Sequence, residues 1–198
     1  MALAGKSEIY NYLLTKYTVM KKFLFINVIL AILLASCSSS NKITTMVGGE
    51  YDPKKDVTDY FVFPLGEVSL PGKWEKTNYF QPAHQQYFKN QDSITIAIAF
   101  GLYDKYDFNH DKSLMGNEFV KAFYDWESEY YTSDELKSEI LETDSVKQYI
   151  IYRFYGSEVN TYFLIREKNG RVSNYSVLAT DKWTESEKIQ FLKSLLKD

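Results

Sequence analysis

The chain has 198 residues, of which 45% are hydrophobic and 25% charged, proportions typical of one folded domain and not of a disordered segment. Its 23 Lys and Arg against 26 Asp and Glu give a net charge of −3, so no basic surplus favours nucleic acid as a partner. Aromatic residues reach 17%, which predicts aromatic strands and a well-filled core.

A signal-like segment lies near the start of the chain. Lys21 and Lys22 precede an apolar run, residues 23–34, and two small residues and then Cys37 follow it. A membrane-spanning helix needs about 20 apolar residues. The shorter run therefore predicts a removable signal peptide, residues 1–36. The chain starts either at Met1, with a long leading region, or at Met20, which would give the signal its usual compact form.

The string Leu34-Ala35-Ser36-Cys37 resembles a bacterial lipobox. The resemblance implies cleavage just before the cysteine, a diacylglycerol thioether on Cys37 and an acylated new amino terminus. Cys37 is the only cysteine of the chain, so it has no partner for an intramolecular disulfide. The alternative is a free thiol beside an uncleaved apolar helix.

The segment after the cysteine predicts a tether and a location. Residues 37–58 lack a sustained apolar period and are expected to form the lipidated cysteine and a flexible tether, ahead of a single domain over residues 59–198. In the sorting rules of enterobacterial lipoproteins, a serine such as Ser38 implies the outer membrane. Residues 38–42 are not acidic, unlike the tethers of some surface-exposed lipoproteins, which favours the periplasmic face.

Short aromatic and β-branched runs predict the strands. In residues 93–100, Ile94, Ile96 and Ile98 alternate with small residues, which indicates a strand with one buried face. Trp74 and residues 79–80 lie between two prolines and predict an edge strand or an irregular connection. The other expected strands cover residues 60–63, 86–89, 139–142, 148–155, 162–166 and 172–179.

Two helices are predicted. The first has Ser113 as its N-cap and an apolar stripe at helical spacing, formed by Met115, Phe119, Ala122, Phe123, Trp126 and Tyr130. The second begins with a capping box, Thr184 to Glu187, and presents Ile189, Leu192, Leu195 and Leu196. The expected fold class is α+β, an antiparallel sheet with a long central helix and a C-terminal helix packed on it.

This element order, with the central helix sequence at residues 118–126 and the Lys182-Trp183 step before the last helix, resembles the PsbP-like fold of bacterial DcrB-type lipoproteins. The resemblance covers about residues 60–198. It implies a small binding or assembly-accessory domain without established catalysis. It carries over no functional residue.

One string resembles a calcium loop. Asp107, Asn109, Asp111 and Glu118 stand at positions one, three, five and twelve of an EF-hand pattern, but Lys112 occupies position six, where glycine is required. The favoured interpretation is a polar loop in which Asp111 or Ser113 caps the following helix.

Other candidate sites are weaker. His84 and His110 lack a second histidine or a cysteine at ligand spacing, so no metal is expected there. The carboxylates of Asp125, Glu127 and Glu129 flank Trp126, as in sites for glycoside chemistry, but the favoured interpretation is a solvated helix face, which Asp125 and Glu129 share. The three tryptophans, Trp74, Trp126 and Trp183, would line a ligand groove or, more commonly, belong to the core.

Together these patterns predict a membrane-anchored lipoprotein of the Gram-negative envelope. Its membrane contact is the lipid on Cys37, an envelope protein is a further possible partner, and no cofactor or enzymatic activity is expected. The alternative functions are a small periplasmic hydrolase and a calcium-binding envelope protein.

Overall fold

The structure is a computed structural model, and it describes residues 44–132, 136–156 and 158–196. The signal segment and Cys37 lie outside these residues. The residues from Thr45 onward form one compact unit. Within the described ranges, no helix is long and apolar enough to cross a membrane.

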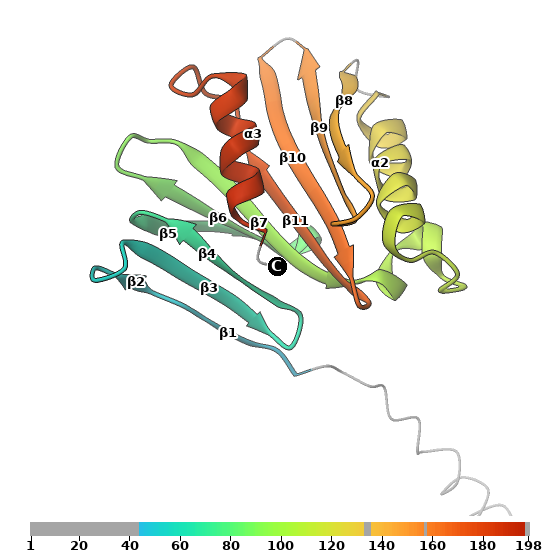
Figure 1. Cartoon of the computed structure of the whole chain (residues 1–198), viewed down its shortest axis with the longest axis horizontal. Coiled ribbons are helices and arrows are strands. Elements are labelled where there is room, and N and C mark those ends of the chain that lie inside the picture. Colours follow the sequence, from blue (N-terminus) through green and yellow to red (C-terminus); the bar gives the residue numbers. More distant parts are fainter. Residues whose placement is uncertain (1–43, 133–135, 157, 197–198) are drawn as a thin grey trace, which may run out of the picture. The chain divides into compact units, whose positions relative to one another are not determined.

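A seven-stranded antiparallel sheet, the large sheet, forms the centre of this unit (Figure 1). Its first strand, β5 (Trp74–Phe80), lies at the edge, as the sequence predicted. The order from that edge is β5, β6 (Gln85–Asn90), β7 (Thr95–Leu102), β11 (Arg171–Val177), β10 (Val159–Lys168), β9 (Tyr149–Gly156) and β8 (Lys137–Asp144).

A second, small sheet is built around β3 (Val57–Phe63), which pairs on one side with β4 (Gly66–Pro71). On its other side β3 pairs with β1 (Met46–Gly48) and β2 (Tyr51–Asp52). Residues from 46 onward therefore belong to the folded domain, and the predicted tether over residues 37–58 extends too far. The pattern missed β1 and β2 because they have only three and two residues, and their side chains are exposed or half-buried.

The first core lies between the two sheets. The alternating isoleucines of β7 and its approach, Ile94, Ile96 and Ile98, are each at most 1% exposed, which confirms the predicted buried face. The small sheet contributes Tyr60 and Leu70 among others. The last helix, α3 (Glu185–Ser194), packs over β10 and β11 and adds Leu192 and Leu195 to the same core.

The opposite face of the large sheet carries α2 (Gly116–Thr132), which packs on β8, β9 and β10. Side chains alternate between the two cores along each strand: on β10, Leu164 belongs to the first core and Ile165 to the second. Three 3₁₀ turns, η1 (Gln81–Ala83), η2 (Tyr103–Lys105) and η3 (Asp107–Asn109), complete the described elements. The predicted α+β class with two packed helices is confirmed.

The helix predictions hold in part. The capping box of α3 is present: the Thr184 hydroxyl accepts from the backbone N–H of Glu187, whose side chain accepts from the backbone N–H of Thr184. The predicted stripe of α2 is rotated from the observed one. Phe119 and Phe123 are buried, whereas Met115 is 49% and Tyr130 65% exposed.

Candidate functional site

A hollow of about 480 Å³ lies at the first turn of α2. Three segments far apart in the sequence form it: the start of α2, the turn between β8 and β9, and the end of β10 with the turn that follows. The lining residues are Met115, Gly116, Asn117, Glu118, Gln148, Glu167 and Asn169.

Glu167 holds these segments together. Its side chain is 1% exposed, and its carboxylate accepts hydrogen bonds from the backbone N–H groups of Gly116, at the start of α2, and of Gly170, at 2.6 Å. A carboxylate at a helix N-terminus also interacts favourably with the helix dipole. Glu167 thus binds the N-terminus of α2, although it lies 51 residues further along the chain.

Gly116 is required where the helix meets the hollow. Its φ of +56° is a left-handed conformation, and a Cβ atom there would lie 2.6 Å from Nε2 of Gln148. Any larger residue would strain the backbone and displace the Gln148 side chain. The glycine therefore preserves both the turn and the space beside it.

The walls of the hollow are polar. Asn117 donates from Nδ2 to the carbonyl of Ser145 at 2.9 Å, and Glu118 is exposed at the rim. Each oxygen of Glu167 already accepts from a backbone amide. The hollow therefore offers amide groups and one exposed carboxylate for hydrogen bonding to a small polar group.

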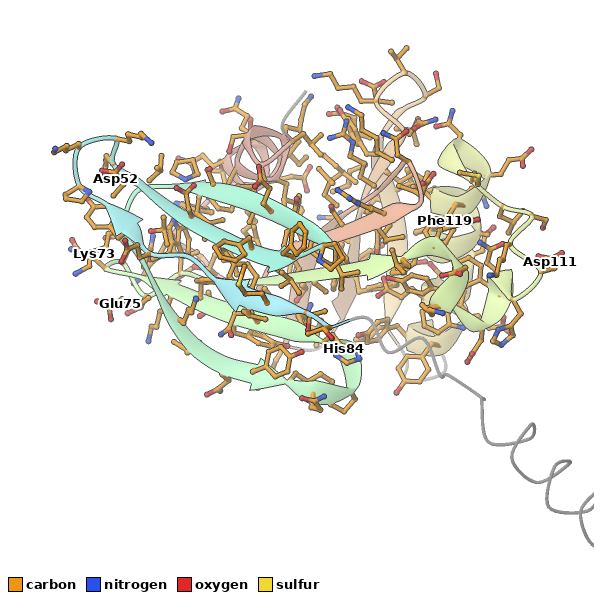
Figure 2. All side chains as sticks on the ribbon, turned by 90° about the horizontal axis from the view of Figure 1, so that it is seen from below. Asp52, Lys73, Glu75, His84, Asp111 and Phe119 are labelled. Carbon is orange, nitrogen blue, oxygen red and sulfur yellow. The ribbon has the colours of Figure 1, made fainter. Side chains whose placement is uncertain are left out.

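Two of the four predicted calcium ligands have structural roles in the loop. The side chain of Asn109 is fully buried: its Nδ2 donates to the carbonyls of Tyr103 and Leu114, and its Oδ1 accepts from the N–H of Leu114. The side chain of Asp111 accepts from the backbone and hydroxyl of Ser113. Figure 2 shows Asp111 at the periphery of the molecule.

The other two predicted ligands are exposed. Asp107 is 83% exposed and pairs with His110 at 3.4 Å, and Glu118 belongs to the rim of the hollow. Lys112 has φ of +60° and pairs with Asp104 at 3.1 Å. Within the described part of the chain, no group of three or more His, Cys, Asp and Glu residues is placed to hold a metal ion.

The predicted helix cap is wrong. The helix begins at Gly116, and its first N–H donates to Glu167, so neither Asp111 nor Ser113 caps it. Asp111 instead binds Ser113 within the loop. No local pattern near residue 116 indicates this partner, because Glu167 lies on β10.

Glu127 is a residue whose role the sequence analysis missed. It was expected on a solvated face with Asp125 and Glu129, which are exposed; Asp125 pairs with Lys121 at 2.5 Å. Glu127 instead accepts a hydrogen bond from the hydroxyl of Tyr152 on β9, a fully buried residue. Burial raises the pKa of the Glu127 carboxyl to about 7, although the Tyr152 hydrogen bond lowers it.

The aromatic side chains around α2 pack mainly on one another. The centroids of their rings lie 5.3–6.4 Å apart in the contacting pairs, and the rings belong to Tyr106, Phe108, Phe119, Phe123 and Trp126. Trp126 is 40% exposed at the margin of this cluster. Burial, followed by the nearby charge of Glu127, raises the pKa of Tyr106.

The remaining predicted residues lie elsewhere. Trp74 and Trp183 pack edge to face at 6.3 Å in the first core, so they share no groove with Trp126. The imidazole of exposed His84 lies 3.2 Å from the hydroxyl of Tyr79, near the end of β5. Cys37, the predicted lipidation site, lies outside the described residues.

Comparisons with known proteins show distant likeness to solved structures. No family model matches the chain, and no curated protein matches it. Among solved structures, the chain is similar to the solution structure of cyanobacterial PsbP (CyanoP) from Synechocystis sp. PCC 6803. The identity is 11% and the TM-score 0.42, over 79% of this chain and 94% of that one. At this level the similarity concerns the course of the backbone.

Proposed function

We propose that this protein is a lipid-anchored, non-catalytic binding or assembly-accessory domain of the Gram-negative cell envelope. Cys37 carries the lipid, and residues 1–36 are its signal peptide. The observation that carries this proposal is the sequence Leu34-Ala35-Ser36-Cys37 at the end of a charged and then apolar segment. Ser38 and the residues after it favour the periplasmic face of the outer membrane.

The start of the folded unit supports this arrangement. The unit begins at Thr45, so only Ser38 to Thr44 separate the cysteine from the domain. Seven residues span at most about 25 Å when fully extended. A lipid on Cys37 would therefore hold the whole domain close to the membrane surface.

The roles of the buried carboxylates favour binding over catalysis. Glu167 is bonded to two backbone amides and fixes the start of α2. Glu127 is bonded to Tyr152 beneath the same helix. Both groups are hydrogen-bonded within the scaffold, and the hollow beside Glu167 offers polar groups for a partner or a small ligand.

The test is metabolic labelling of the full chain with a palmitate analogue in a Gram-negative host, followed by fractionation. We expect label on the parent and its recovery with the outer membrane. Cys37→Ala should lose the label and the processing, whereas the matched control Ser40→Ala should keep both. A Cys37→Ala chain that is labelled and cut like the parent would contradict the proposal.

Capture from the native envelope tests the accessory role. The lipidated protein should retain an envelope protein after mild cross-linking, and substitutions at the rim of the hollow, such as Glu118→Lys, should reduce this recovery. Turnover of a small substrate by the purified protein in a broad hydrolase screen would instead favour the hydrolase alternative.

A further inference from the structure

A small apolar patch lies at one end of the small sheet. Met46 and Phe63 are each 62% exposed, and they are direct partners in the register of β1 and β3. Val47, the neighbour of Met46 on β1, is 57% exposed but pairs with Val62 and so points to the other face of the small sheet. We call Met46, Phe61 and Phe63 the β1–β3 patch.

The register explains why these side chains face outward. Along β3, Thr58 and Tyr60 are buried toward the large sheet, so Phe61 and Phe63 point to the other face. Met46 pairs with Phe63 and therefore shares that face. The ring of Phe61 lies over Gly48, where a Cβ atom would come within 2.4 Å of it, so the glycine lets the aromatic side chain lie flat on β1.

The outer face of the small sheet is polar at its other end. Asp52, Asp59 and Glu50 line a second hollow there, of about 510 Å³. Figure 2 shows Asp52 at the turn at one end of the sheet, whereas β1 begins at the other. Asp59 precedes Phe63 by four residues, or about 13 Å along the strand. The two most exposed apolar side chains, Met46 and Phe63, thus lie at the end where the chain enters the fold, whereas Phe61 also lines the hollow.

That end is also the part of the domain nearest in sequence to Cys37. Nine residues along the chain lead from Cys37 to Met46, which is about 30 Å when extended and about 17 Å on average for a flexible coil. A lipid anchor would therefore hold Met46 and Phe63 within reach of the bilayer surface.

From these observations we propose that the β1–β3 patch docks on the lipid bilayer that holds the anchor, with Met46 and Phe63 inserted at its interface. This inference rests on the proposed lipidation of Cys37. Docking would fix the orientation of the domain, with the acidic end of the small sheet kept in water. A docked domain would always present the same surface to its partners, the one that points away from the membrane.

The test uses the full, lipidated chain reconstituted in phosphatidylethanolamine and phosphatidylglycerol vesicles that contain a lipid-borne quencher. The lipid occupies the thiol of Cys37, so a dye attaches only to an introduced cysteine. Val47→Cys places the dye beside the patch, on the residue that follows Met46 in β1. Tyr130→Cys, at a 65% exposed aromatic position on the opposite face of the large sheet, is the matched control.

We expect quenching at position 47 and little at position 130. Met46→Ser with Phe63→Ser should lower the docked fraction reported at position 47 by about tenfold or more, because two apolar side chains no longer enter the interface. Met115→Ser, at an exposed position on the other face of the large sheet, should leave it unchanged.

The mass of the reconstituted chain separates the two proposals. Lipid on Cys37, with position 47 no more quenched than position 130, would overturn the docking proposal alone. A chain without lipid on Cys37 would overturn the proposed function and, with it, this inference.

Discussion

At the scale of single residues, Glu127 is the side chain whose environment departs most from its sequence context. It lies on α2 between two exposed acidic positions, yet it turns toward the sheet and bonds to Tyr152. The tyrosines Tyr106 and Tyr131 also lie near this pair. The sequence analysis grouped Glu127 with its exposed neighbours because charged helical side chains are mostly exposed. Position 127 is nevertheless at helical spacing from Phe123 and Tyr130, at the margin of the predicted stripe.

The raised pKa of Glu127 makes stability depend on pH. In the unfolded chain the carboxyl titrates near 4.5, and in the fold its pKa is about 7, so the native state holds the proton more tightly. Stability should therefore fall as pH rises from about 4.5 to about 7, by up to about 3 kcal/mol. Glu127→Gln mimics the protonated form, and its stability relative to the parent should rise over this range.

Urea melts of both chains at pH 5 and pH 8 check this prediction. The difference between variant and parent isolates Glu127, since the other titrating groups are common to both chains. Glu129→Gln, at an exposed position two residues further along, should show no such change. A parent and a Glu127→Gln chain with parallel pH profiles would show that the acid is not held protonated.

The loop that resembles a calcium site should not respond to the ion. Both sides of the Asn109 amide are bonded to the loop backbone, and Lys112 carries a positive charge beside the predicted ligands. We expect the same melting temperature in millimolar calcium and in chelator, for the parent and for Asp107→Ala. Bound calcium at a hundredfold excess over its dissociation constant would add about 2.7 kcal/mol, so a rise abolished by Asp107→Ala would reveal a site.

At the scale of the elements, the start of α2 depends on a residue of β10. Glu167→Gln keeps the size of the side chain but replaces one carboxylate oxygen by an NH₂ group. That group would face a backbone N–H, which is also a donor. We expect a loss of about 1–3 kcal/mol, because a buried donor would be left without an acceptor. For a domain of this size this lowers the melting temperature by several degrees, at roughly 2–4 °C for each kcal/mol.

The matched control for this variant is Glu118→Gln, an exposed acid on the same turn of α2. It should remain within about 0.5 kcal/mol of the parent. Equal melting temperatures for the two variants would mean that Glu167 does not hold the helix start.

The capping box of α3 provides a second test at this scale. Thr184→Ala removes the hydroxyl that accepts from the N–H of Glu187, and it should cost about 1 kcal/mol. Ser186→Ala, in the same first turn, should cost much less, because no capping bond involves its side chain. Thermal melts of the two variants compare them directly, and indistinguishable melts would contradict this role of Thr184.

The contrast between the two helices shows what a sequence can predict. The box of α3 lies within four consecutive residues and was recognised from them, as was the alternation of Ile94, Ile96 and Ile98. The start of α2 depends on Glu167, and the hollow beside it joins residues near 116, 148 and 168. Of the lining residues, only Glu118 was named as a candidate site residue and Met115 as part of the apolar stripe, because pairing between distant strands leaves no local pattern.

At the scale of the whole molecule, a two-sheet domain follows the predicted signal peptide and a short connection. The predicted class and most of the large sheet followed from periodicity, as did the end of β3, whereas β1 and β2 were taken for part of the tether and β4 was not recognised. β1 and β2 are too short to show an alternation, and their side chains are exposed or half-buried. The domain begins near residue 45, so the connection from Cys37 is shorter than the sequence predicted. The β1–β3 patch therefore belongs to the part of the domain that follows Cys37 within a few residues.

The proposed lipid on Cys37 anchors this domain to its membrane. Mass spectrometry of the amino-terminal tryptic peptide, from full-length protein purified from Gram-negative membranes, is the decisive test. We predict a peptide that begins at Cys37 and ends at Lys42, with its mass increased by a diacylglycerol and an amino-terminal acyl chain. A peptide with an unmodified Cys37 still joined to Ser36 would show that Cys37 is neither cleaved nor lipidated.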